Sequence, residues 1–283
     1  MAAGMGLFAV VDTLAKWLVA AHPVPQILAV RSAAALLILL PFVWRAGWRT
    51  FATDEPYKHA LRAGLVIAEV AFFYLAIRHM ALAEVMLVYF AAPLFVTALA
   101  GPMLGEKVGW RRWSAVLLGF LGVYLVLEPS GEGISTAGLV ALAGSLAFAL
   151  VMVSTRKLRA AGGLVLITYQ TAGVLVASGV AVVAVPGGWA PTEVSSLALF
   201  AVVGVGSMIA YYLVNRSLVL APAAIVAPFN YTSIVWALGL GYLVFGDMPT
   251  EKSLAGGAII VVAGLYNFYK ESRTGRPMTP VAE

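Results

Sequence analysis

The chain has 283 residues, of which 62% are hydrophobic and only 11% are charged, whereas about 25% of the residues of an ordinary soluble domain are charged. A soluble globule of this length could not cover its surface with groups that hold water. The composition therefore excludes a large soluble domain, a DNA-binding module and a cofactor domain of Rossmann size. It predicts an all-α membrane protein whose solvent is the lipid bilayer.

Long apolar runs separated by short polar segments follow one another along the chain. A helix needs about 20 apolar residues to cross the hydrocarbon core, so the length allows roughly ten crossings. A transmembrane barrel would need alternating apolar and polar residues, which these uniformly apolar runs lack. We predict ten spans in chain order, near residues 3–21, 25–43, 59–77, 82–103, 113–128, 136–154, 164–186, 196–214, 221–245 and 254–269.

The Lys and Arg residues gather on one side of the predicted membrane. Fourteen of the 18 fall in segments on one side, two fall on the other, and Lys16 and Arg31 fall within spans. Short cytoplasmic loops are enriched in Lys and Arg, so we predict that both termini are cytoplasmic. These cations fit short loops and not an ordered basic domain, and we therefore expect no nucleic-acid partner.

The two halves of the chain resemble each other. The segment 73–84 matches 211–222 at an offset of 138 residues. Because each half holds five predicted spans, an odd number, the second half must be inserted upside down. We predict two inverted five-helix repeats, residues 1–130 and 131–271, followed by a flexible cytoplasmic tail, 272–283. Inverted repeats are typical of secondary transporters, although a duplicated scaffold or a channel is the alternative.

Two segments, 81–127 and 220–268, also resemble the repeat signature of the EamA-type transporters of the drug/metabolite transporter superfamily. The most specific marks are the run Pro93, Leu94 and Phe95, and the pair Gly105 and Glu106 with its counterpart Gly246 and Asp247. Aspartate at 247 departs from the usual glutamate. The resemblance implies a bacterial inner-membrane carrier of ten helices without a bound cofactor, in which the third, fourth, eighth and ninth helices surround a central cavity.

The expected function is export of small metabolites by alternating access, with amino acids, including aromatic or other neutral ones, as the leading substrates. The alternatives are a carrier or importer for nucleotides, sugars or vitamins, and an intramembrane enzyme. Neither HExxH nor GxSxG occurs, and the chain has no cysteine, so we expect no catalytic residues and no metal site. The GxxxG spacing of Gly101 and Gly105 predicts close helix packing, in a monomer or a weak homodimer.

Four charged residues lie more than four residues from either end of a predicted span, where a charge is costly unless it faces protein or water. Asp12 and Lys16, four residues apart, could form an intrahelical pair; alternatively Asp12 is a proton site and Lys16 a substrate contact. Arg31 suits a carboxylate but could instead extend to the membrane interface. Glu69 is the candidate for proton coupling, with a packed structural carboxyl as the alternative.

Uncharged polar and aromatic residues on the cavity helices are candidates for binding the substrate, although tyrosines at a membrane interface are a competing explanation. Prolines that interrupt corresponding spans point to a cavity or a hinge. The cavity candidates are Tyr74, Tyr89, Pro93, Tyr211, Tyr212, Asn230 and Tyr231, and the gating candidates are Pro228 and His79. His79 could equally be an ordinary exposed loop histidine.

Overall fold

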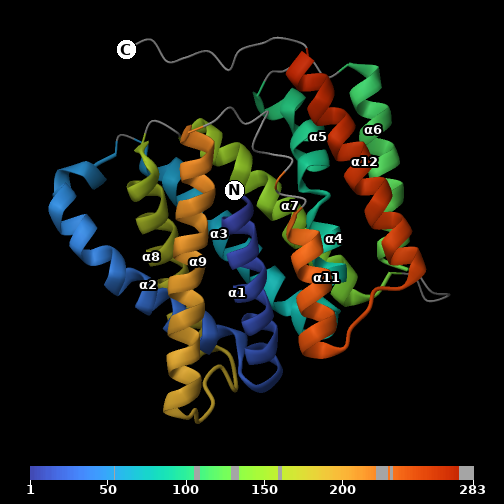
Figure 1. Cartoon of the computed structure of the whole chain (residues 1–283). Coiled ribbons are helices and arrows are strands. Elements are labelled where there is room, and N and C mark those ends of the chain that lie inside the picture. Colours follow the sequence, from blue (N-terminus) through green and yellow to red (C-terminus); the bar gives the residue numbers. More distant parts are fainter. Residues whose placement is uncertain are drawn as a thin grey trace.

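The computed structural model describes residues 1–53, 55–104, 109–128, 134–158, 161–220, 229 and 232–273, and within these ranges it contains helices and no strand. The helices are arranged in a bundle (Figure 1). Their bounds are α1 Ala2–Ala21, α2 Val24–Ala46, the 3-10 helix η1 Trp48–Phe51, α3 Pro56–His79, α4 Leu82–Tyr89, α5 Ala92–Leu104, α6 Trp110–Val126, α7 Thr136–Lys157, α8 Gly163–Ala184, α9 Val194–Leu220, α11 Thr232–Phe245 and α12 Glu251–Arg273.

These helices follow the predicted apolar runs. Seven segments are long and apolar enough to cross a membrane: α1, α2, α3, the stretch Leu82–Leu99 across α4 and α5, Thr136–Thr155 in α7, α8, and Val194–Val214 in α9. Helix α11 is apolar but has 14 residues, and most of the preceding part of its predicted span lies outside the described residues. The all-helical membrane class is therefore confirmed, whereas ten crossings in two inverted repeats remain a prediction.

The fourth predicted span consists of two helices. Helix α4 ends at Tyr89, a turn covers Phe90 and Ala91, and α5 begins at Ala92. Pro93 stands in the first turn of α5, where its missing N–H removes no helical hydrogen bond; in a continuous helix its ring would clash with the carbonyl group of Tyr89. The interruption predicted from Pro93 is confirmed.

Helices that are far apart in the sequence pack together. Helix α3 packs against α7 and α8, α9 packs against α1 and α2, and α2 also packs against α8. Helix α6 lies beside α12, and α1 and α4 both contact α11. Figure 1 shows α6 and α12 at one side of the bundle and α2, α8 and α9 at the other.

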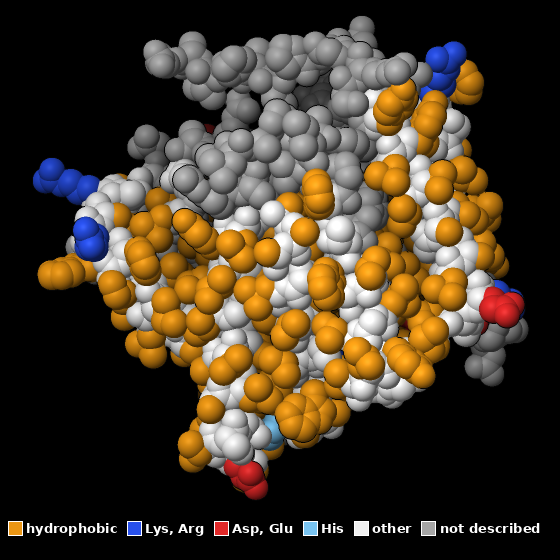
Figure 2. Space-filling view, in the orientation of Figure 1, with side chains coloured by type: hydrophobic (Ala, Val, Ile, Leu, Met, Phe, Trp, Pro, Cys, Tyr) orange, Lys and Arg blue, Asp and Glu red, His pale blue; other side chains and the backbone are white. Residues whose placement is uncertain are grey.

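The outside of the bundle is apolar around its middle. Figure 2 shows hydrophobic side chains over the central part of one face, and the coloured Lys, Arg, Asp and Glu side chains around its edges. Exposed apolar side chains include Leu117 and Leu121 on α6, Val180 and Val183 on α8, and Leu243 on α11. Such a surface suits lipid tails, because an apolar patch of this extent is unusual on a soluble monomer.

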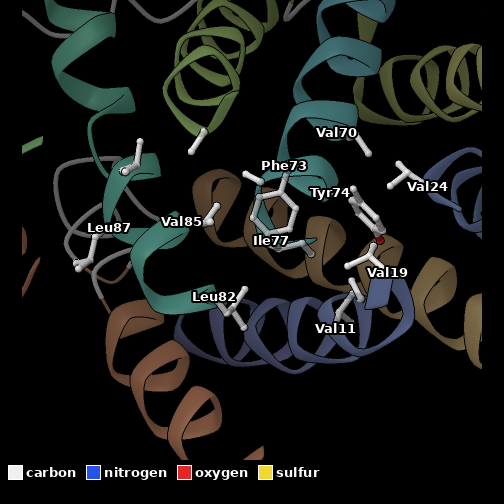
Figure 3. Close-up of a cluster of buried hydrophobic side chains, with 14 of the residues drawn as sticks. Val11, Val19, Val24, Val70, Phe73, Tyr74, Ile77, Leu82, Val85 and Leu87 are labelled. Atoms are coloured by element: carbon white, nitrogen blue, oxygen red, sulfur yellow. The ribbon is translucent and has the colours of Figure 1, made fainter. Parts of the chain in front are cut away.

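The buried core joins the first helices of the chain. Val11 and Val19 on α1 face Tyr74 and Ile77 on α3, with Val85 of α4 close by (Figure 3). Most of this cluster is aliphatic, so the hydroxyl group of Tyr74 is an exception within it. This exception leads to the polar residues described below.

Two glycines bring α6 and α12 into backbone contact. A Cβ atom added at Gly256 would lie 2.5 Å from the carbonyl oxygen of Gly122, and one added at Gly122 would lie 2.6 Å from the carbonyl oxygen of Gly256. No side chain fits between these helices at this point. Close approach through small residues is a general means of packing helices in membranes.

We expect Gly256→Ala to destabilise the protein, because the new methyl group must push α6 away from α12. Overpacking of this kind costs about 1–3 kcal/mol. The measurement is the apparent melting temperature in detergent. Gly179→Ala on α8 is the matched control, since nothing lies near its added Cβ and both changes gain the same helix propensity. Equal melting temperatures for the two variants would contradict the packing described here.

Candidate functional site

A fixed positive charge lies among the helices. Arg31 of α2 is half-buried, and its Nη1 donates a hydrogen bond of 2.5 Å to the hydroxyl group of Tyr74 on α3. The guanidinium group also lies over the Tyr74 ring, 5.0 Å from its centroid. Tyr74 itself is 2% exposed, so a rigid side chain holds Arg31. Arg31 thus faces protein and does not extend to the membrane interface.

Two carboxyl groups share the surroundings of Arg31 without touching it. Asp12 of α1 and Glu69 of α3 both interact electrostatically with Arg31. Neither forms an ion pair with it, and neither side chain hydrogen-bonds to any residue that the structure describes. Glu69 is 8% exposed and Asp12 is partly buried. Arg31 and the two carboxyl groups therefore lie near one another but beyond ion-pair distance.

Two further tyrosines lie near these charges. The ring of Tyr211 on α9 packs edge to face against Phe8, with 4.8 Å between the centroids, and Tyr211 is electrostatically coupled to Asp12, Arg31 and Glu69. The hydroxyl group of Tyr89 donates to the carbonyl oxygen of Glu69 at 3.3 Å. We define the polar cluster as Asp12, Arg31, Glu69, Tyr74 and Tyr211, with Tyr89 at its edge.

Glycines on α9 allow the backbones that carry the polar cluster to approach. A Cβ atom at Gly204 would collide with the backbone of Arg31, and one at Gly206 would lie 2.7 Å from a methyl group of Val11, which precedes Asp12. Helix α9 therefore packs directly against the turns that carry Asp12 and Arg31. A movement of α9 must displace both turns.

A cavity of about 40 Å³ opens beside the polar cluster, between α2, α3, α8 and α9. Its polar lining residues are Arg31, Ser32, Gln170, Thr171, Ser207 and Tyr211. This volume holds a few water molecules, whereas small-molecule sites usually have about 300–1,000 Å³. A metabolite can therefore enter only if the helices move.

Lys16 pairs with a distant residue. Its Nζ lies 2.5 Å from Oδ2 of Asp247, which follows α11, and 4.8 Å from the centroid of the Phe245 ring. The intrahelical pair of Asp12 and Lys16 considered from the sequence is wrong, because Lys16 turns to Asp247 and Asp12 lies near Arg31. The contact ties α1 to the segment after α11.

Arg62 connects helices at the other end of the bundle, where α3 begins. It is 7% exposed, and its Nε donates to Oγ1 of Thr155 on α7 at 2.8 Å. Its Nη2 donates to Oε1 of Gln170 on α8 at 3.3 Å. Arg62 lies near the start of the predicted span 59–77, and sequence analysis singled out neither Arg62 nor Gln170. The available signal was that Arg62 lies seven residues before Glu69, on the same helix face.

The remaining candidates are placed differently. Tyr212 is 64% exposed, so its assignment to the cavity beside Tyr211 is wrong. Pro93 is exposed at the start of α5, and His79 is exposed at the end of α3; a gating role for His79 remains a prediction. Three candidates lie outside the described residues, namely Pro228, Asn230 and Tyr231. Among the described residues, no three His, Asp or Glu side chains are grouped as a metal site requires.

Comparisons with known proteins point to transport. The model of a family described as EamA-like transporters matches the chain twice, over residues 1–128 and 135–269. An S-adenosylmethionine uptake transporter of Rickettsia bellii is 25% identical over 84% of this chain and 81% of its own length. A riboflavin transporter of Rhizobium johnstonii is 28% identical over 95% and 89%.

A pseudopaline exporter of Pseudomonas aeruginosa is also similar, at 28% identity over 90% of each chain. Among solved structures, one crystal structure with 17% identity has a TM-score of 0.65 and covers 96% of this chain and 97% of that chain, which shows a shared fold. By their names, the first of these three relatives is an uptake transporter and the third is an exporter.

We expect Tyr74→Phe to destabilise the protein by about 1.5–3 kcal/mol, the usual worth of a hydrogen bond to a charged group. The change removes the acceptor of Arg31 and leaves the ring in place. The free energy of unfolding in detergent is the measurement. Tyr242→Phe is the control, because Tyr242 is largely exposed on α11. If both variants lost the same stability, the Arg31 contact would have no special weight.

Proposed function

Because the chain belongs to the EamA-like transporter family, we propose that it is a secondary carrier built from two inverted halves. It exports small metabolites, foremost amino acids, across the bacterial inner membrane. The observation that carries this proposal is the polar cluster, which lies inside an apolar bundle at helices from both halves and borders a cavity too small for a metabolite. A carrier needs such a site, exposed to each side in turn.

The packing of the helices supports two equivalent halves. Let α1, α2 and α3 correspond to α7, α8 and α9, and let α6 correspond to α12. Under this correspondence, the contact of α1 with α9 is the counterpart of the contact of α7 with α3, and both occur. The contact of α2 with α9 is likewise the counterpart of the contact of α8 with α3. The contacts of α2 with α8 and of α6 with α12 each join two corresponding helices. The two separate family matches support the same division.

The orientation follows from the distribution of positive charge. Fourteen Lys and Arg residues fall in segments on one side of the ten predicted spans and two fall on the other, and short cytoplasmic loops carry the excess. Both chain termini are then cytoplasmic. In this orientation Arg62 lies towards the cytoplasm and the pair of Lys16 and Asp247 lies towards the outside.

Alternating access then has two identifiable sets of closing contacts. On the outer side, Lys16 of the first half binds Asp247 of the second. On the inner side, Arg62 of the first half binds Thr155 and Gln170 of the second. Opening towards one side requires one set to separate while the other set holds. Rocking of the two halves about the polar cluster would separate one set of contacts and keep the other.

The assignment of amino acids rests on the family resemblance and on the hydrogen-bonding groups of the polar cluster. Its tyrosine hydroxyl groups and cavity serines suit a small polar solute. The relatives carry solutes as different as S-adenosylmethionine, riboflavin and pseudopaline by their names, so the family alone leaves the substrate and the direction open.

The transport test uses the purified full chain in liposomes. We expect efflux of preloaded radiolabelled neutral amino acids at a rate well above that of protein-free liposomes. Riboflavin and S-adenosylmethionine serve as comparison solutes, and each is assayed in both directions. Movement of riboflavin with no movement of any amino acid would overturn the substrate assignment, and movement of none of these solutes would contradict the proposed carrier activity for this panel.

We expect Lys16→Met to favour opening towards the outside, because it removes one partner of the outer contact. The chain has no cysteine of its own, so Ser32→Cys in the cavity lining can report access. Labelling of this cysteine by an impermeant reagent added outside should become about tenfold faster, which corresponds to about 1.4 kcal/mol. The control is Lys58→Met, because Lys58 pairs with Glu55 on the surface. Unchanged labelling in Lys16→Met would refute the role of the outer contact.

A further inference from the structure

We propose that the polar cluster is a subsite with two ends, which selects solutes that bear both a carboxylate and a cationic group. Arg31 takes the carboxylate, and Asp12 and Glu69 take the cation. This inference rests on the proposed carrier function and adds to it the residues that recognise each end of the substrate. It rests on three features of the cluster: unused donors on Arg31, carboxyl groups without a partner among the described residues, and the absence of an ion pair between the two.

Arg31 has donors to spare. A guanidinium group has five N–H donors in a fixed fork, and the structure uses Nη1 to bind Tyr74. Arg31 lines the cavity, and no carboxylate of a described residue lies within ion-pair distance of it. A fork held at one corner by Tyr74 is oriented to receive a carboxylate from a solute, which is the geometry that arginine binds best.

Asp12 and Glu69 need a cation. Glu69 is more than nine-tenths buried, and its carboxyl group has no hydrogen-bond or ion-pair partner among the described residues. A buried charge without a partner is strongly unfavourable. Arg31 lies within their electrostatic reach but does not contact them. A cationic solute group that reaches Asp12 and Glu69 offsets the cost of a buried negative charge, so the carboxyl groups can ionise beside it.

The two ends of the cluster do not form an ion pair with each other. If the charges served only to hold the helices together, contact between them would be the most favourable arrangement, as Lys16 and Asp247 show at 2.5 Å. Arg31 is instead held by Tyr74, while Asp12 and Glu69 project from α1 and α3. The Tyr211 hydroxyl group has no hydrogen-bond partner among the described residues and is electrostatically coupled to all three charges. A zwitterionic solute can satisfy the anion end, the cation end and this hydroxyl group together.

Recognition at the two ends also links binding to movement. Gly204 of α9 touches the backbone of Arg31, and Gly206 lies against Val11 beside Asp12. A solute that draws Arg31 and Asp12 towards each other acts on two turns that both rest on α9. A solute with one charged group acts on one turn alone and gains less from the movement.

The test compares matched analogues on the purified full chain. Alanine, leucine and phenylalanine are each paired with their amide, which keeps the cation, and with their N-acetyl derivative, which keeps the carboxylate. Binding is read as the rise in melting temperature with ligand concentration, because a ligand that binds the folded state stabilises it. We expect at least one free amino acid to bind at least tenfold more tightly than either of its derivatives.

Substitutions then separate the two ends. Arg31→Gln should reduce the preference for the free amino acid over its amide at least fivefold and leave the preference over the N-acetyl derivative. Glu69→Gln and Asp12→Asn should have the opposite pattern. Arg31→Lys keeps the charge without the fork and should give an intermediate preference, which serves as a second reading if Arg31→Gln folds poorly. Arg111→Gln, in the peripheral helix α6, is the control and should leave both preferences unchanged.

The possible failures are distinguishable. If liposomes transport amino acids and every variant keeps the wild-type preferences, the carrier function stands and the subsite assignment is overturned. If none of the nine compounds binds, or if derivatives with one charge bind as tightly as the free amino acids, the proposed selectivity is wrong. The proposed function itself fails only in the liposome assay.

Discussion

The structure depends on how a fixed positive charge is held inside an apolar helix bundle. Arg31 cannot lose its charge, and a charge within a membrane is tolerated only where protein or water surrounds it. Tyr74 accepts one hydrogen bond from Arg31 and offers it an aromatic face, and the carboxyl groups of Asp12 and Glu69 lie within its electrostatic reach. The proposed site is therefore formed by the helices that surround Arg31.

The ends of the bundle are closed by different chemistry. The pair of Lys16 and Asp247 is ionic, whereas Arg62 relies on the neutral groups of Thr155 and Gln170. In a carrier of the proposed kind the closing contacts must be weak enough to separate, because the two access states have to lie within a few kcal/mol of each other. Contacts confined to a few polar groups at each end meet this requirement better than a broad apolar seam would.

The sequence predicts local features better than distant contacts. Apolar runs predicted the helices, and Pro93 predicted the break before α5, because both follow from residues near in the chain. Spacing suggested Asp12 as the partner of Lys16, but the actual partner, Asp247, is 231 positions away. Helix α9 has no distinct apolar face, so its sequence does not indicate which side packs inward. Only its packing against α1 shows that Tyr211 faces the bundle and Tyr212 does not.

The contact between α6 and α12 has a consequence for biosynthesis. Gly122 meets Gly256, and α12 is the last helix described in the chain. The contact at Gly122 therefore cannot form until α12 has left the ribosome. Lys16, in the first helix, likewise lacks Asp247 during most of synthesis. Early helices can insert as they emerge, but this packing can form only after α12 has been synthesised, and a ribosome that stalls before α12 leaves a chain without this contact.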